Sequence, residues 1–91
     1  MTSNSNNMRW EEGNVIHLDV RPILEAGDEP YSVIMKELSI IDSNHELVIH
    51  VLFDPVPLRT QIKNRGFVEE CTKVDVDHWL LKVKRFQPLE I

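Results

Sequence analysis

Residues 46–67 read ELVIHVLFDPVPLRTQIKNRGF, and this stretch decides the fold. Residues 46–53 are apolar except for Glu46 and His50, which predicts a central strand covered on one face and on part of the other. Asp54-Pro55-Val56-Pro57 then predicts a turn into a helix, because Asp54 can cap a helix and proline suits its first positions. Gly66 stands where the left-handed residue after a helix is expected.

The flanking sequence predicts three more strands and one more helix. Residues 15–19 form a short β-branched run, and residues 21–29 are expected to be a loop because they hold Pro22 and Gly27. Pro30 suits the start of a helix, and apolar residues follow at helical spacing up to Ile41. Residues 67–74 and 78–85 are expected to form a hairpin. In its second strand three residues should face the helices, namely Trp79, Leu81 and Val83.

This order, β-α-β-α-β-β, predicts an α/β (α+β) two-layer sandwich. Each βα unit favours a parallel strand pair, and the final hairpin adds antiparallel strands. We therefore expect a four-stranded mixed sheet with two helices on one face. The single domain should span residues 14–86, between a flexible N-terminal tail over residues 1–13 and a C-terminal tail over residues 87–91.

Composition excludes several classes of protein. The 91 residues carry a net charge of −5, which argues against a DNA-binding protein. Residues 55–91 hold seven basic and five acidic side chains, but the basic ones lack stacking aromatic neighbours, so RNA binding is not expected. No apolar run approaches the roughly 20 residues of a membrane-spanning helix. With one cysteine and no visible secretory leader, a cytoplasmic protein is expected.

Several local motifs resemble the TusA-like (SirA-like) sulfur-carrier superfamily. They are the LDVR of residues 18–21, a loop ending in Pro30, and Asp54-Pro55 before the second helix. The stretch DPVPLRTQIKNRGF is more similar to an uncharacterised branch of that superfamily, a domain of unknown function found fused to or encoded near hemerythrin-like or redox proteins. The resemblance covers about residues 15–85 and implies a TusA-like fold.

One departure from the sulfur carriers changes the expected function. Those proteins have a Cys-Pro pair at the start of the first helix, and the cysteine carries a persulfide. Here Glu29 precedes Pro30, and a carboxylate cannot carry sulfur. The sequence also has no nucleophile elbow and no glycine-rich phosphate loop. The resulting hypothesis is a non-enzymatic protein-interaction or small-ligand-binding module without a cofactor.

Polar residues at the predicted strand ends form a candidate ligand site. Asp19, Arg21, Glu29, Pro30 and Asp54 should lie near the carboxyl ends of strands, where ligands of α/β sheets bind. In one interpretation they form a small polar or anion-binding site with Arg21 as the main contact. In the other, Arg21 pairs with an acid and the acids cap helices.

Cys71 and the histidines supply the alternative chemistry. Cys71 lies beside Glu69 and Glu70, whose charges should raise the thiol pKa and favour a structural role. The alternative hypothesis is a sulfur-relay or redox accessory protein that uses Cys71.

His17 and His50 are expected to be neighbours on adjacent strands. No metal centre is expected, because none of the four histidines, which include His45 and His78, shows a metal-ligand spacing.

The sheet face away from the helices is unusually apolar for a solvent face. It should hold Val48, His50, Leu52, Val68, Val74 and Leu80. Either Trp10 from the tail covers it, or it binds a protein partner or a second copy. A hemerythrin-like or redox protein is one such partner.

Overall fold

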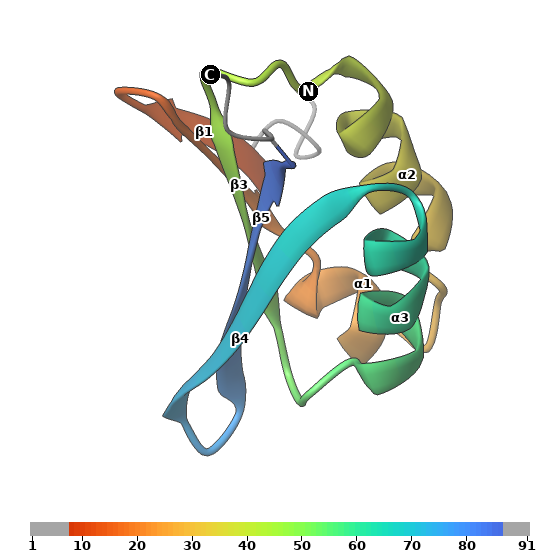
Figure 1. Ribbon diagram of the computed structural model, residues 1–91. Coiled ribbons are helices and arrows are strands. Elements are labelled where there is room, and N and C mark those ends of the chain that lie inside the picture. Colours follow the sequence, from red (N-terminus) through yellow and green to blue (C-terminus); the bar gives the residue numbers. More distant parts are fainter. Residues whose placement is uncertain (1–7, 87–91) are drawn as a thin grey trace, which may run out of the picture.

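The computed structural model describes residues 8–86, which fold into a mixed sheet with helices on one face (Figure 1). The strands are β1 Arg9–Glu12, β2 Val15–Asp19, β3 Glu46–Val51, β4 Phe67–Asp75 and β5 His78–Arg85. The helices are α1 Arg21–Glu25, α2 Tyr31–Ile40 and α3 Val56–Asn64. The predicted α/β sandwich is confirmed at this level.

The sheet has the strand order β1-β2-β3-β5-β4. Strands β2 and β3 are parallel because α1 and α2 return the chain to the starting end of the sheet. The other neighbouring pairs are antiparallel. Strand β3 therefore lies in the middle, as its apolar sequence predicts.

The prediction of four strands is wrong, because residues 9–12 form a fifth. Strand β1 pairs with β2 through a turn at Gly13, whose φ of 61° suits glycine. All four residues of β1 are exposed, so the strand has no apolar alternation to mark it in the sequence. Residues 1–7 and 87–91 of the predicted tails lie outside the described residues.

The prediction of two helices is also wrong, because Arg21–Glu25 forms the short helix α1 where a loop was expected. Pro22 lies in its first turn, where a missing N–H breaks no helical hydrogen bond. The proline was therefore a helix-start signal and not a loop signal. None of the helices within residues 8–86 is long and apolar enough to cross a bilayer.

The predicted cap of α3 is a further correction. Asp54 makes no capping hydrogen bond, and Pro55 occupies the N-cap position. The Asp54 carboxylate accepts hydrogen bonds from Arg59 instead. Gly66 does adopt the expected positive φ, at 92°.

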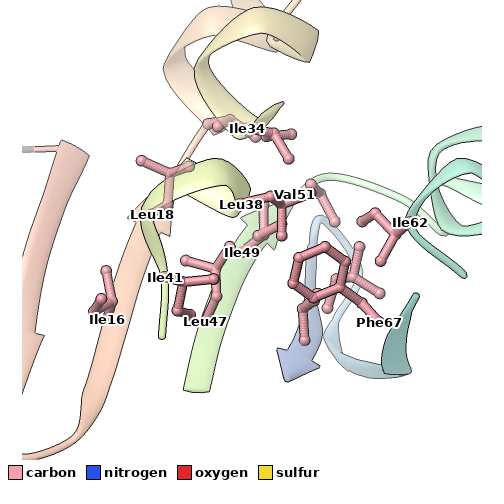
Figure 2. Packing of buried hydrophobic residues seen from close by; sticks show 13 residues of the cluster. Ile16, Leu18, Ile34, Leu38, Ile41, Leu47, Ile49, Val51, Ile62 and Phe67 are labelled. Carbon is pink, nitrogen blue, oxygen red and sulfur yellow. The ribbon is translucent and has the colours of Figure 1, made fainter. Parts of the chain in front are cut away.

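The core lies between the sheet and the helices (Figure 2). Leu47, Ile49 and Val51 of β3 point into it, and Ile34 and Ile62 cover them from α2 and α3. Leu81 and Val83 are fully buried and Trp79 packs partly against the same cluster, as expected for the helix-facing side of β5.

Truncation of Ile62 should destabilise the fold. Ile62 is the only fully buried residue of α3, so Ile62→Ala leaves a cavity and should lower the free energy of unfolding by about 2–5 kcal/mol. Ile40→Ala is the matched control, because Ile40 is 62% exposed. This substitution should lower the free energy of unfolding by less than about 1 kcal/mol. Urea unfolding measures both. Equal losses in the two variants would contradict the packing described here.

Candidate functional site

Asp19 and Arg21 form a closed ion pair at the end of β2. Arg21 donates from Nε and Nη2 to the two carboxylate oxygens of Asp19, at 2.9 and 2.8 Å, and its backbone N–H donates as well. Burial opposes ionisation of Asp19, but the hydrogen bonds from Arg21 outweigh it and lower the pKa of the carboxyl group. The guanidinium is therefore already occupied by an acid, which favours the ion-pair interpretation over an anion site.

Glu29 and Pro30 lie elsewhere, on the wall of an apolar pocket of about 200 Å³. The pocket opens where α1 ends, α2 and α3 begin, and the chain leaves β3. Its lining is mostly aliphatic, aromatic and proline side chains. The lining residues are Leu24, Glu29, Pro30, Tyr31, Ile34, Val51, Phe53, Pro55, Pro57, Leu58 and Gln61.

Both helices that begin at this pocket have bare N-termini. The N-cap residues are Pro30 and Pro55, neither helix has a side-chain cap, and neither has an acidic residue in its first turn. The first N–H groups of a helix carry partial positive charge when no side chain satisfies them. The pocket thus combines an apolar lining with two weakly positive helix ends.

Few polar groups line the pocket. The Tyr31 hydroxyl donates to Gln61 at 2.9 Å and accepts from Arg65 at 3.3 Å. Glu29 is exposed and makes no ion pair with the other described residues. It is therefore available to accept a hydrogen bond from a bound molecule.

Asp54 belongs to a third group of side chains, between α3 and β4. Arg59 donates to Asp54 at 2.9 Å and to the buried carboxylate of Glu69 at 2.6 Å. Cys71 is the neighbouring thiol. Burial, followed by the charge of Asp54, raises the pKa of Cys71, so the thiolate is disfavoured there.

The open face of the sheet carries a row of three imidazoles. His17 Nδ1 lies 3.0 Å from His50 Nε2, and His50 Nδ1 lies 2.8 Å from His78 Nε2. His17 Nε2 lies 3.0 Å from a carboxylate oxygen of Glu12. One arrangement of neutral rings satisfies every contact: each imidazole donates from Nε2 and accepts at Nδ1, and the row ends on the carboxylate.

Trp10 covers this row from β1. Its ring stacks on His17 with centroids 4.8 Å apart and also approaches His50. His50 and Val48 are both buried although they face away from the helices. Burial lowers the pKa of His50 from 6.5 to about 4; Asp19 opposes this shift, whereas His78, His17 and Arg21 add to it.

The structure thus divides the predicted strand-end residues into three places. Asp19 and Arg21 pair with each other, Glu29 and Pro30 line the pocket, and Asp54 joins Arg59. Sequence reasoning anticipated the contact of His17 with His50 but not that of His78. The missed signal was that His50 and His78 fall on the same face of the paired strands β3 and β5.

No group of three or more acidic, histidine or cysteine side chains among residues 8–86 is arranged to hold a metal ion. In the imidazole row the ring nitrogens already face one another as hydrogen-bond partners. The row is therefore a hydrogen-bonded chain and not a set of ligands converging on one point.

Comparison with known proteins identifies one family. Residues 17–85 match the family model described as "Uncharacterized conserved protein (DUF2249)". No curated protein and no solved structure shows significant similarity to the chain.

The low pKa of His50 predicts a loss of stability on acidification. Between pH 6.5 and about 4 the unfolded chain binds a proton at His50 that the folded chain does not. The free energy of unfolding should therefore fall as the pH decreases through this window. His50→Leu should reduce that slope, because the residue no longer titrates.

Urea unfolding from pH 7.5 to 4.5 measures the slope. His45→Gln is the control, since His45 is paired only with the exposed Asp42 and lies outside the row. A His50→Leu slope equal to that of the unmodified protein would show that the buried imidazole does not set the acid response.

Proposed function

The chain belongs to the DUF2249 family, and on that premise we propose that it is a non-enzymatic binding module for a small organic ligand. The observation that carries this proposal is the apolar pocket at the start of α2 and α3. Ligand sites are typically apolar concavities with a few polar groups that orient the bound molecule. This pocket has that composition, with Glu29, Tyr31 and Gln61 as its polar groups.

The volume and the polar groups of the pocket also limit the size and charge of the ligand. Its volume of about 200 Å³ is below the roughly 300–1,000 Å³ of sites for drug-sized molecules. A small aromatic ring system or a short branched alkyl group matches this space. Glu29 favours a ligand with a hydrogen-bond donor. The two uncapped helix ends and Arg65, which donates to the Tyr31 hydroxyl, disfavour a ligand with a net positive charge. We therefore propose a neutral ligand with a small apolar body and a hydrogen-bond donor.

We propose further that the fold is TusA-like and that sulfur transfer has been lost. Pro30 before α2 and Asp54-Pro55 before α3 support the resemblance, and β1 and α1 are additions to it. The pocket begins at Glu29-Pro30, the positions that a Cys-Pro pair occupies in the sulfur carriers. Glu29 cannot form a persulfide, so this site is assigned to binding.

The alternative function is a sulfur-relay or redox accessory protein that uses Cys71. Fewer observations support this function than support the binding module. The thiol lies between a β strand and a helix, beside Asp54, and its raised pKa disfavours the reactive thiolate. The nearby Arg59 favours the thiolate, but two carboxylates already bind this guanidinium.

A protein partner on the open sheet face is a separate part of the proposal. Trp10 approaches His50, and both Val48 and His50 are buried. The apolar side chains left exposed on this face therefore lie toward the other edge of the sheet, where Val68 is 51% exposed. A cytoplasmic location is consistent with a single free thiol.

The pocket should bind a small aromatic probe. 6-Fluoroindole has one apolar ring system and one N–H donor, and its binding to the full chain can be followed by fluorine NMR. Phe53→Ala removes part of the pocket wall and should weaken binding about fivefold, the effect of losing about 1 kcal/mol of apolar contact.

Val56→Ala is the matched control for this measurement. Val56 is 57% exposed, close to the 52% of Phe53, but it does not line the pocket. The affinity of the Val56→Ala variant for 6-fluoroindole should stay within about twofold of that of the unmodified protein. Equal binding by all three proteins, or no binding to any, would refute the pocket as the ligand site.

Cys71→Ser separates the two functions. The binding module should keep its affinity for 6-fluoroindole in this variant, because Cys71 does not line the pocket. Native mass spectrometry of the protein purified without reductant should show no added sulfur. A mass increment of one sulfur atom that Cys71→Ser abolishes would instead support the sulfur-relay function.

A further inference from the structure

Strand β4 is a long, open edge of the sheet. It has nine residues and stands last in the strand order, so within the described chain only β5 pairs with it. The β4–β5 hairpin extends away from the helical layer (Figure 1), and residues 72–75 are exposed. One edge of such a strand presents unpaired backbone N–H and C=O groups to any strand that can align with it.

We propose that β4 pairs antiparallel with β4 of a second copy of this chain, about a two-fold axis at Cys71. An interface of this kind is isologous, since each residue meets a fixed partner on the other copy and the relation is mutual. The two sheets then join into one continuous sheet. None of the β4 residues lines the pocket, so this proposal does not depend on the proposed ligand.

The side chains of β4 are complementary to themselves in this register. With Cys71 opposite Cys71, Glu70 lies opposite Thr72 of the second copy, and this pair occurs twice in the dimer. Both residues are exposed, so the Thr72 hydroxyl can donate to the Glu70 carboxylate. Glu69 adds no further pair, because its buried carboxylate already accepts from Arg59 at 2.6 Å. No two like charges are opposed between residues 69 and 73, and at the ends Val68 comes beside Val74 of the second copy.

Two neighbouring registers would also keep every β4 side chain on the same face of the joined sheet, and both are unfavourable. A shift of the axis to residue 70 opposes Glu70 to Glu70. A shift to residue 72 places Glu70 opposite Val74 and leaves its carboxylate without a polar partner. Like charges directly opposite one another destabilise a strand pair. Glu70 therefore selects the register centred on Cys71.

Exposure and local geometry agree with a short, central contact. Val68 and Val74 are 51% and 54% exposed, so each end offers apolar area that a second copy can cover. The β4–β5 ladder is irregular between Lys73 and Asp75, which limits regular pairing to the preceding residues. Those residues include the complementary pair Glu70 and Thr72.

The other sheet edge is a poorer match for a second copy. Strand β1 has only four residues. Its Arg9 is already held by Glu37 at 3.0 Å and by Glu11 at 3.1 Å. A strand of this length offers fewer backbone hydrogen bonds than β4, so the long edge is the interface that we assign.

The test exploits the predicted partner of Thr72. Thr72→Lys places a lysine opposite Glu70 of the second copy and should tighten the dimer, whereas Thr72→Glu opposes two carboxylates and should weaken it. Each cross-strand pair contributes about 0.2–1 kcal/mol and occurs twice, so we expect dissociation constants to move in opposite directions by up to about 30-fold.

Sedimentation equilibrium of the full chain in low salt measures these constants. Thr60→Lys and Thr60→Glu are matched controls, because Thr60 is exposed on α3 and lies outside β4; they should leave the constant within about twofold. Circular dichroism verifies that each variant is folded. Three results would overturn the proposal: a monomer at millimolar concentration, equal weakening by both Thr72 variants, or equal shifts in the Thr60 controls.

Discussion

Burial of β3 on both faces is the constraint on which the rest of the structure depends. Its helix-facing residues Leu47, Ile49 and Val51 are covered by α2 and α3, and Val48 and His50 are buried on the opposite face. A strand without a polar face must lie inside the sheet and needs cover on both sides. The helices provide one cover, and Trp10 of β1 with the imidazole row provides the other.

The same constraint explains where the pocket forms. Strand β3 ends at Val51, and the chain then turns through Asp54-Pro55 into α3. The start of α2 stands beside this turn, and prolines at both N-caps leave the helix ends without polar caps. Elsewhere the polar groups are satisfied: none of the buried side-chain nitrogen or oxygen atoms of the described residues lacks a hydrogen-bond partner. The pocket is thus an apolar surface left open where these helix ends meet, with the exposed carboxylate of Glu29 at its wall.

The sequence predicted those elements that carry a clear apolar pattern. Strand β3 followed from its continuous apolar run, β2 from its β-branched residues, and α2 and α3 from apolar residues at helical spacing. Pro30, Asp54-Pro55 and Gly66 marked the helix ends. Strand β1 was missed because none of its four residues is buried, and α1 because Pro22 was interpreted as a loop residue. The Asp19–Arg21 ion pair was one of two stated possibilities. The pocket could not be predicted, because it depends on how three helix ends meet, and the place of His78 in the imidazole row depends on the register of β5 against β3.

Intermolecular nuclear Overhauser effects between a small aromatic probe and the methyl groups of the full chain test the central claim most directly. The account predicts contacts from the probe to the methyls of Leu24, Val51 and Leu58, which line the pocket. Contacts to Val68 and Leu80 on the open sheet face, with none to the pocket methyls, would contradict it.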